Sequence, residues 1–341
     1  MTTHAPPLAM PESTAREVEV DVLIVGAGPS GLYGAYYAGF RGWSVAVVDS
    51  LPELGGQVSA LYPEKAILDV AGFPTVKGRE LVEQLVRQAA PARPTYLLDR
   101  TATGLEIDDG DDGGLVMTMD DGSVVRAKAM VITAGIGKFT ARPLPSGDGW
   151  EGRGLVFFVP SFTEYADRDV VIVGGGDSAF DWAAGLDGIA RTITVVHRRD
   201  RFRAHQATVD AVLASDTEVV TNAEVTALRG DAVVEEVEIT TKAGDVLTRP
   251  AQAVVAALGF VADLGPMEAW GLDLDHRHIR VDSSMRTNLP RVFAAGDITE
   301  YDGKVRLIAV GFGEVATAVN NAATLIDPAA HVFPGHSSDG S

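Results

Sequence analysis

A glycine-rich turn near the start of the chain combines residue types that can hold the pyrophosphate of a dinucleotide. The turn reads Gly26-Ala27-Gly28-Pro29-Ser30-Gly31, between an apolar run at 20–25 and a helix-like run at 32–38. Glycines at this spacing allow a tight turn, close approach of backbone to pyrophosphate and close helix–strand packing. A second apolar run, 44–48, ends at Asp49, an acid placed to accept hydrogen bonds from ribose hydroxyls. This context indicates a nucleotide site.

The same pattern returns in the second half of the chain. An apolar run, 169–173, leads into Gly174-Gly175-Gly176-Asp177-Ser178-Ala179, and a further run, 192–196, ends at His197. In both copies the first glycine stands 23 residues before the residue that ends the second run. An internal repeat of this kind signals two copies of one binding unit. At the second nucleotide we expect contacts from Gly174, Gly176, Asp177 and Ser178.

The two copies differ in the charge that follows their second strand. The first ends in Asp49, whereas the second ends in His197-Arg198-Arg199, with Arg203 close behind. A carboxylate accepts hydrogen bonds from ribose hydroxyls but repels a 2′-phosphate, which arginine binds through bidentate, charge-assisted bonds. The first unit therefore fits FAD or NAD, and the second fits NADP bound through these arginines and His197. At a position without this strand and glycine turn before it, such an arginine cluster would more often belong to the solvated surface of the protein.

Composition narrows the class of protein. The chain has 341 residues, too many for one ordinary core, so two domains are expected. Its net charge of −19 argues against nucleic acid as the main partner, because binding a phosphate backbone needs a basic surface. The chain contains no cysteine, which excludes a disulfide, a thiolate metal site and a redox-active dithiol. No metal site is expected, and electron chemistry must come from a bound cofactor.

The N-terminal residues and the hydropathy predict a cytoplasmic protein without membrane contact. The first residues are rich in Pro, Thr, Ser and Ala and lack the basic and apolar regions of a secretory signal. We therefore expect a disordered leader over 1–17. No apolar run approaches the length of a membrane span.

The remaining segments predict an α/β protein of two Rossmann-like, three-layer ββα dinucleotide-binding domains, with the NADP domain inserted into the FAD domain. The expected FAD domain covers 18–139 and 262–330, and the expected NADPH domain covers 140–261, with a C-terminal extension over 331–341. The elements that support this division are a helix over 80–90, an antiparallel layer with a hairpin over 98–125, buried strands over 129–135 and 253–259, a crossing over 137–149, and a helix that opens at Gly311.

Longer stretches resemble a known family. The two fused units and the closing Ala294-Ala295-Gly296-Asp297 are similar to the two-domain flavin pyridine nucleotide-disulfide oxidoreductases, among them thioredoxin reductase. Thioredoxin reductase carries a Cys-x-x-Cys before its second glycine motif, where this chain has 156–161 without sulfur. A closer resemblance is to the thioredoxin-reductase-like (type 2) ferredoxin–NADP+ reductases. The segments that carry it are 55–65, 69–74, 197–200, 202–205 and 307–314.

The resemblance implies site residues beyond the glycine turns. Besides Asp49, the residues implied to contact FAD are Gly56, Gln57, Tyr62, Ala102 through its backbone, Phe139 and Asp297. The resemblance implies that Tyr62 stacks on one flavin face. It also implies a homodimer, in which His336 of a C-terminal extension covers the other face from the partner subunit. A hydroxyl residue after this histidine, Ser337 or Ser338, is implied to complete the contacts.

The resemblance also implies the chemistry. NADPH would deliver a hydride to flavin N5, and single electrons would then pass to an iron–sulfur partner, ferredoxin. Tyr62 and His336 would act as flavin-stacking groups, with no acid or base assigned. A helix starting near Gly313 could stabilise the reduced flavin through its N-terminal N–H groups. Two alternatives stay open: reduction of flavodoxin, a quinone or another small acceptor at the same site, or a non-enzymatic nucleotide-binding scaffold.

Overall fold

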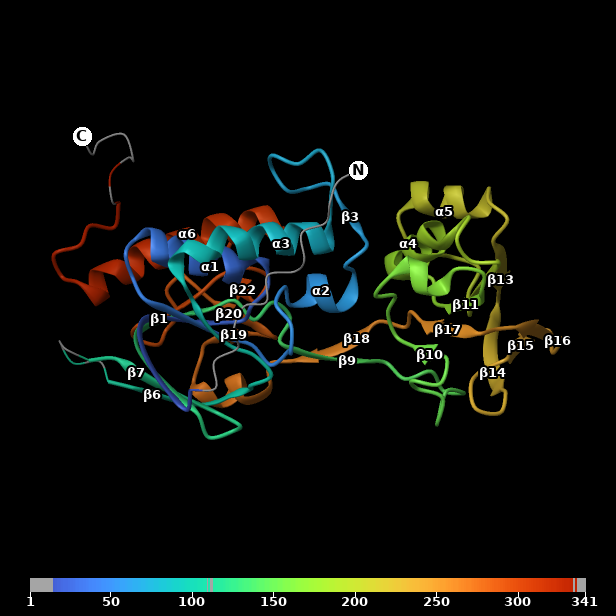
Figure 1. The fold of residues 1–341 in the computed structure, drawn as a ribbon, viewed down its shortest axis with the longest axis horizontal. Helices are drawn as coiled ribbons and strands as arrows, with labels where there is room; N and C mark the ends of the chain where they lie inside the picture. Colours follow the sequence, from blue (N-terminus) through green and yellow to red (C-terminus); the bar gives the residue numbers. More distant parts are fainter. Residues whose placement is uncertain (1–14, 109, 111–112, 334, 336–341) are drawn as a thin grey trace. The chain divides into compact units, whose positions relative to one another are not determined.

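The computed structural model describes residues 15–108, 110, 113–333 and 335, and the chain divides into two units (Figure 1). The first unit comprises the chain up to residue 60, then 66–138 and the segment from 262 onward; the second comprises 61–65 and 139–261. The second unit is thus inserted into the first. Residues 1–14 of the expected leader lie outside the described residues, and the first strand begins at Glu17.

A seven-stranded sheet forms the centre of the first unit. Its strands are β1 (Glu17–Val25), β2 (Val45–Val48), β5 (Thr95–Leu97), β6 (Ala102–Ile107), β7 (Leu115–Met119), β8 (Val124–Ile132) and β21 (Val292–Ala294). The order is β5-β2-β1-β8-β7-β6, and β21 also pairs with β8. The pairs β5–β2, β2–β1, β1–β8 and β8–β21 are parallel, so their carboxyl ends meet at one edge, where open α/β sheets bind ligands.

The long strand β8 replaces two elements that the sequence suggested separately. Its first half pairs with β7 and alternates between buried and more exposed residues, while Met130 to Ile132 pair with β21 and are buried. The alternation predicted a hairpin arm, and the apolar run predicted a new strand over 129–135. The strand is continuous because β1 pairs with it along its whole length while its other neighbour changes from β7 to β21.

Three helices lie on one face of this sheet: α1 (Pro29–Phe40), α3 (Gly78–Ala89) and α6 (Ile308–Ile326). Helix α1 contacts both of the others (Figure 1). On the opposite face, Leu23 and Val25 of β1 pack with Leu264 and Met267. The smaller elements are α2 (Gln57–Leu61), β3 (Ala66–Ile67), β4 (Val76–Lys77), β19 (Leu274–Asp275), β20 (His278–Arg280), β22 (Thr299–Glu300) and 3-10 helices at Ala90–Ala92 and Gly265–Trp270.

Helix α6 begins earlier than its glycines suggested. The sequence predicted an Ala-rich helix that opens at Gly311. The helix instead begins at Ile308, and both Gly311 and Gly313 lie within it. A side chain at Gly311 would overlap the hydroxyl of Ser30, so this glycine lets α6 approach the first glycine turn. The unpaired N–H groups of the helix therefore belong to the turn that begins at Ile308, and the expectation that Gly313 supplies them is wrong.

The second unit is built on a five-stranded parallel sheet in the order β10-β17-β11-β12-β13, with bounds β10 (Leu155–Val156), β11 (Asp169–Val173), β12 (Thr192–His197), β13 (Glu218–Thr221) and β17 (Ala253–Ala256). An antiparallel meander follows, with β14 (Ala223–Arg229), β15 (Glu236–Thr241) and β16 (Val246–Pro250). The helices are α4 (Asp177–Leu186), α5 (Gln206–Leu213) and a 3-10 helix at Phe162–Tyr165.

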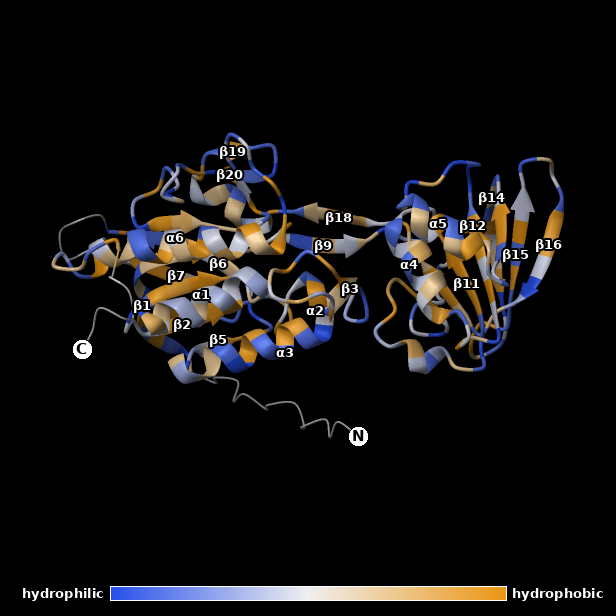
Figure 2. Cartoon of the chain, turned by 90° about the horizontal axis from the view of Figure 1, so that it is seen from above, coloured by the Kyte–Doolittle hydropathy of each residue, from blue (hydrophilic) through white to orange (hydrophobic). Residues whose placement is uncertain are grey.

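Strand β11 shows why this unit has three layers. After Asp169, the residues of this strand are apolar (Figure 2), and all of its residues are buried. Val170 and Ile172 belong to the core cluster that contains Phe180 of α4, whereas Val171 and Val173 belong to the cluster that contains Val225 of β14. Helices therefore cover one face of the parallel sheet and the meander covers the other, which is the ββα layering expected from the sequence.

Two strands, β9 (Lys138–Ala141) and β18 (Phe260–Asp263), connect the units. They pair as a two-stranded sheet, and each runs across a boundary between the units. The crossing expected over 137–149 therefore contains a strand, β9, near its start.

Candidate functional site

The first glycine turn joins β1 to α1 and leaves no room for side chains at two of its glycines. Gly26 has a φ of +114°, and a Cβ atom there would lie 2.5 Å from the carbonyl oxygen of Thr133. A side chain at Gly31 would overlap the carbonyl oxygen of Gly26. Gly28, the N-cap of α1, has nothing within 4 Å of where its Cβ atom would be. The backbone is therefore bare where a pyrophosphate would approach the helix N-terminus.

Asp49 directly follows β2 and is oriented by two backbone groups. Its Oδ2 accepts a hydrogen bond from the Ala27 N–H at 2.6 Å, and its Oδ1 accepts one from the Leu51 N–H at 2.9 Å. Burial raises the pKa of the carboxyl, and the backbone hydrogen bonds oppose that rise. A carboxylate has about four acceptor positions. Two N–H donors therefore orient Asp49 without using all of its capacity to bind ribose hydroxyls.

The loop after Asp49 returns to the glycine turn. The Gly55 N–H donates a hydrogen bond to the Ala27 carbonyl oxygen at 2.9 Å. Gly56 has a φ of +56°, and a Cβ atom there would lie 2.9 Å from Gly28 Cα. This close approach brings Gly56 to the open glycine of the turn, and its contact with FAD stays a prediction.

Gln57 and Asp297 reach the same region from two other elements. Gln57 begins α2, and its Nε2 lies 2.5 Å from where a Cβ atom of Gly135, just beyond β8, would be. Asp297 lies just beyond β21, after Gly296, where a Cβ atom would lie 3.0 Å from Ser30 Oγ. Both residues therefore lie at the carboxyl edge of the sheet, next to the first turn.

Asp297 is partly buried, and its surroundings act on its pKa in both directions. Burial raises the pKa of the carboxyl. The positive charges of Lys304 and Arg306 lower it, and the negative charge of Glu314 raises it again. Lys304 and Glu314 were not among the predicted site residues. The 307–314 segment was singled out from the sequence, but nothing in it indicated a buried charge.

Ala102 begins β6 beside the Asp49 loop. The Arg100 N–H donates to the Asp49 carbonyl oxygen at 3.1 Å, and the Asp99 N–H donates to the Leu51 carbonyl oxygen at 3.0 Å. These bonds bring the start of β6 to the acid, which is what the predicted backbone contact of Ala102 requires.

Other predicted residues are not gathered at this turn by the described contacts. Tyr62 and Phe139 group with the second unit, and the Phe139 ring packs edge-on against Phe260 with centroids 5.7 Å apart. The residues of the expected tail contact, His336, Ser337 and Ser338, lie outside the described residues. Their roles at a flavin stay predictions.

The second glycine turn repeats the plan of the first. A side chain at Gly174 would overlap the carbonyl oxygen of Ala257, and Gly176, the N-cap of α4, has nothing within 4 Å of where its Cβ atom would be. Ser178 lies exposed in the first turn of α4. The third position is a buried alanine, Ala179, so the helix packs less closely on this turn.

The arginine-rich loop after β12 folds back onto the second turn. The Arg203 N–H donates to the Gly175 carbonyl oxygen at 2.8 Å. The His205 N–H donates to Asp177 Oδ1 at 2.9 Å. Asp177 therefore holds the loop as well as opening the helix, and the arginine side chains lie exposed beside the open glycine.

The His197 ring lies between the second glycine turn and this loop. Its ring atoms lie 2.5 Å from where a Cβ atom of Gly175 would be, its Nε2 is 3.2 Å from the Arg201 carbonyl oxygen, and its ring centroid is 5.7 Å from that of Phe202. Burial lowers the pKa of His197, and the neighbouring arginines lower it further. The neutral form of the His197 imidazole is therefore favoured beside an exposed cationic loop.

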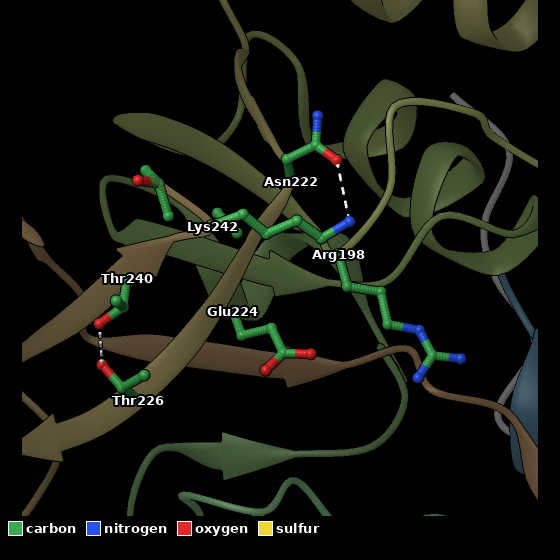
Figure 3. A pocket seen from close by; sticks show the side chains of 8 residues that line it. Arg198, Asn222, Glu224, Thr226, Thr240 and Lys242 are labelled. Carbon is green, nitrogen blue, oxygen red and sulfur yellow. Dashed lines mark hydrogen bonds between the residues drawn. The ribbon is translucent and has the colours of Figure 1, made fainter. Parts of the chain in front are cut away.

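A pocket beside Arg198 contains a cation that sequence reasoning missed (Figure 3). The lining residues are Arg198, Asn222, Ala223, Glu224, Thr226, Thr240, Thr241 and Lys242. Lys242 Nζ donates to Asn222 Oδ1 at 3.2 Å. Lys242 follows β15 directly, and only the three-dimensional fold brings it to the end of β12.

The donor sets of the two turns fit dinucleotides. The open sides of Gly28 and Gly176, each at a helix N-terminus, suit a pyrophosphate. Within the described residues, no group of three or more His, Asp or Glu side chains could hold a metal ion. The described helices also include none that is long and apolar enough to span a bilayer.

Comparison with known proteins shows extensive similarity. The profile of the family described as pyridine nucleotide-disulphide oxidoreductase matches residues 20–322. A relative from Nocardioides sp., named ferredoxin–NADP reductase, is 71% identical over 96% of this chain and 99% of its own length. A relative of the same name from Halalkalibacterium halodurans is 44% identical over 94% of this chain and 98% of its own.

Solved structures give the same fold. The thioredoxin reductase of T. acidophilum is 26% identical, with a TM-score of 0.73 over 91% of this chain and 98% of that one. The thioredoxin reductase of Lactococcus lactis is 24% identical, with a TM-score of 0.72 over 90% of this chain and 99% of that one. The predicted fold class is therefore confirmed.

Proposed function

The chain belongs to the pyridine nucleotide-disulphide oxidoreductase family, and we propose that it is an FAD-dependent reductase that transfers electrons between NADPH and ferredoxin. The observation that carries this proposal is the contrast between the ends of the two second strands. An acid lies beside the first open glycine, and a cationic loop lies beside the second. The relative at 71% identity, named ferredoxin–NADP reductase, supports the choice of electron partner.

The side chains of the first unit would hold FAD. The bare backbone at Gly28 admits the pyrophosphate, and Asp49, already oriented by two N–H donors, accepts hydrogen bonds from ribose hydroxyls. Gln57 and Asp297 reach the same edge of the sheet and would contact the flavin end. Bound FAD would supply the chemistry that the side chains lack, since it exchanges two electrons with a nicotinamide and single electrons with other partners.

The second unit would bind NADPH in preference to NADH. Gly176 offers the same open approach to a pyrophosphate as the first turn. Arg198, Arg199 and Arg203 lie exposed on the loop that Asp177 holds, where bidentate bonds to a 2′-phosphate are favourable. Because NADH lacks the 2′-phosphate, it would leave these three arginines without an anionic partner.

The absence of cysteine separates this proposal from thiol reduction. The two solved structures described above are named thioredoxin reductases, but this chain contains no cysteine. No dithiol can therefore relay electrons within these residues, and electrons must leave the cofactor directly for the acceptor. We propose a cytoplasmic enzyme, and its net charge of −19 argues against nucleic acid as a partner.

We also propose a homodimer in which the C-terminal extension reaches the partner subunit. An aromatic cluster on α1 and α6 supports a contact surface, with members Tyr33, Tyr36, Tyr37, Phe40 and Phe312. The Phe40 side chain is 56% exposed. Next to it, Arg41 Nη2 donates to the His331 carbonyl oxygen at 2.9 Å, so the extension begins beside this cluster.

In the proposed dimer, Tyr62 and the partner's His336 would cover the two flavin faces. Sedimentation of the native protein and of Phe40→Asp tests the assembly, with a dimer expected for the first and monomers for the second. A native protein that sediments as a monomer would contradict the assembly but not the cofactor assignment.

The central experiment is spectroscopic. The purified protein should show flavin bands that NADPH bleaches much faster than NADH, and cytochrome c reduction should depend on added ferredoxin. A protein that is colourless and takes up no FAD would contradict the proposal and leave a nucleotide-binding scaffold. Bleaching by NADPH without any effect of ferredoxin would instead favour flavodoxin, a quinone or another small acceptor.

A further inference from the structure

A buried ion pair lies behind the Gly296–Asp297 corner. The side chains of Lys304 and Glu314 are 1% and 5% exposed, and Lys304 Nζ lies 2.5 Å from Glu314 Oε1. Burying two charges is costly, and a well-packed apolar pair of similar volume often stabilises a fold equally well. Stability alone therefore gives little reason for this pair.

Both charges hold the same residue. Glu314 Oε2 accepts a hydrogen bond from the Gly296 N–H at 2.7 Å, and Lys304 Nζ donates to the Gly296 carbonyl oxygen at 3.0 Å. Thr299 Oγ1 donates to that carbonyl oxygen at 2.8 Å. Gly296 has a φ of +82°, so the chain turns sharply between β21 and Asp297. The pair thus fixes the backbone on which Asp297 is carried.

Tyr301 completes the cluster. Its hydroxyl donates to Glu314 Oε1 at 2.5 Å. Burial, together with the hydrogen bond to Glu314, raises the pKa of Tyr301 to about 12, so the phenol keeps its proton at neutral pH. Glu314 therefore has three donors around its two oxygens, and its charge is matched by Lys304. The arrangement is satisfied but sensitive, because removing one charge leaves the other buried without its counter-charge.

We propose that Lys304, Glu314 and Tyr301 form a positioning cluster that orients Asp297 toward the flavin and balances the electrostatic potential there. This inference rests on the proposed function, in which Asp297 contacts FAD. The cluster is continuous with the first glycine turn, since a Cβ atom at Gly296 would lie 3.0 Å from Ser30 Oγ. The two charges cancel at the site, so losing one must change the potential in the opposite sense to losing the other.

The test compares the midpoint potential of bound FAD in three variants. Glu314→Gln keeps an acceptor for the Gly296 N–H but leaves the charge of Lys304 unbalanced, which favours the anionic reduced cofactor and should move the potential in the positive direction. Lys304→Met leaves the charge of Glu314 unbalanced and should move the potential in the negative direction. The double variant Lys304→Met/Glu314→Gln should return close to the native value.

The dissociation constant of FAD, measured by fluorescence, gives a second readout. Lys304→Met also loses the bond to the Gly296 carbonyl oxygen, so its dissociation constant should rise about tenfold or more. Arg249→Met is the matched control, because it breaks a pair with Glu218 in the second unit at 2.6 Å. This control should leave both the FAD affinity and the potential unchanged.

Potentials that move in the same direction in both single variants, or do not move, would overturn the inference and leave a structural role only. If Lys304→Met fails to fold, Glu314→Gln and the double variant still show in which direction the midpoint potential of bound FAD moves. A native protein that binds no FAD would defeat the proposed function itself. Native FAD binding with unchanged variants would defeat only the positioning role.

Discussion

The two glycine turns share one backbone plan but differ in how closely the helix packs. Gly28 and Gly176 are equally open where a Cβ atom would be, as expected if each turn binds the pyrophosphate of a dinucleotide, as proposed above. A side chain at Gly31 would overlap the Gly26 carbonyl oxygen, whereas the equivalent Ala179 fits as a buried side chain. The openness at Gly28 and Gly176 is therefore explained by the proposed pyrophosphate, whereas the third position of each turn reflects only how closely the helix packs.

The residues after the second strands teach the complementary lesson. Asp49 and His197 occupy equivalent positions. Burial raises the pKa of Asp49 and lowers the pKa of His197, and both shifts favour the neutral form of the side chain. What differs is what surrounds them: backbone N–H donors around the acid, and an exposed cationic loop above the imidazole. In the proposed assignment, the residues that follow the second strands, and not the glycine turns, distinguish the two ligands.

The largest effect should come from exchanging the third positions. Gly31→Ala forces α1 away from the turn and should destabilise the first unit by about 3 kcal/mol. We expect loss of bound FAD, measured by absorbance after purification, and a lower denaturation midpoint. The mirror change Ala179→Gly should cost only about 1 kcal/mol and leave the FAD content intact. If Gly31→Ala keeps the native FAD content, the helix packing at the first turn is not closer than at the second, and the comparison is wrong.

The next effect concerns the cationic loop. Arg198→Ala/Arg199→Ala should lower kcat/KM for NADPH about 100-fold, since charge-assisted bonds are worth about 1.5–3 kcal/mol each. The value for NADH should barely change. Arg229→Ala, which removes an exposed ion pair with Glu238 elsewhere in the same unit, is the control. An equal loss with both nucleotides would show that the loop does not read the 2′-phosphate.

The pH dependence of unfolding should have opposite signs at the two equivalent positions. Burial raises the pKa of Asp49 above 3.8, so the folded state binds this proton more tightly and stability from this group falls as the pH rises through that range. Burial lowers the pKa of His197 below 6.5, so the unfolded state takes up the proton first and stability falls as the pH drops below 6.5.

Urea unfolding followed at several pH values measures these slopes. His197→Gln should flatten the loss of stability as the pH falls below 6.5. Asp49→Asn should steepen that loss, because it removes the opposing contribution of a carboxyl whose pKa is raised by burial. A native slope in His197→Gln would mean that burial does not perturb this imidazole.

The smallest effect belongs to the pocket beside Arg198. Lys242→Met should raise the KM for NADPH about two- to fivefold, because single exposed charges contribute about 0.2–1 kcal/mol. The maximal rate and the KM for NADH should stay as in the native protein. Lys128→Met, which removes an ion pair with Asp21 in the first unit, is the matched control. An unchanged KM for NADPH would limit the phosphate site to the arginines.

Features set by local sequence could be predicted, and the glycine turns are the clearest case. Gly26 to Gly31 and Gly174 to Ala179 lie where their flanking apolar runs placed them, because the strand, turn and helix are consecutive in the chain. The limits of β8 and α6 were wrong for long-range reasons. β8 continues because its neighbours change along its length, and Gly311 lies inside α6 because Ser30 packs against it.

Side chains that act through the fold left no comparable signal. Lys304 and Glu314 are ten residues apart and form a buried pair only because α6 approaches the end of β21. Lys242 reaches Asn222 only because the meander returns to the end of β12. Both would be read from the sequence as ordinary surface charges, since lysine and glutamate are mostly exposed.

The insertion of one unit into the other imposes an order on biosynthesis. β8 is complete at Ile132, but its partner β21 begins only at Val292, about 160 residues later. At about 5–20 residues per second, a ribosome needs about 8–30 s to supply that partner. The main segment of the second unit, 139–261, emerges within this interval, while the half of β8 that β21 will cover has β1 as its neighbour on one side and no strand on the other. The nascent chain is thus open to misassembly until β21 has been synthesised.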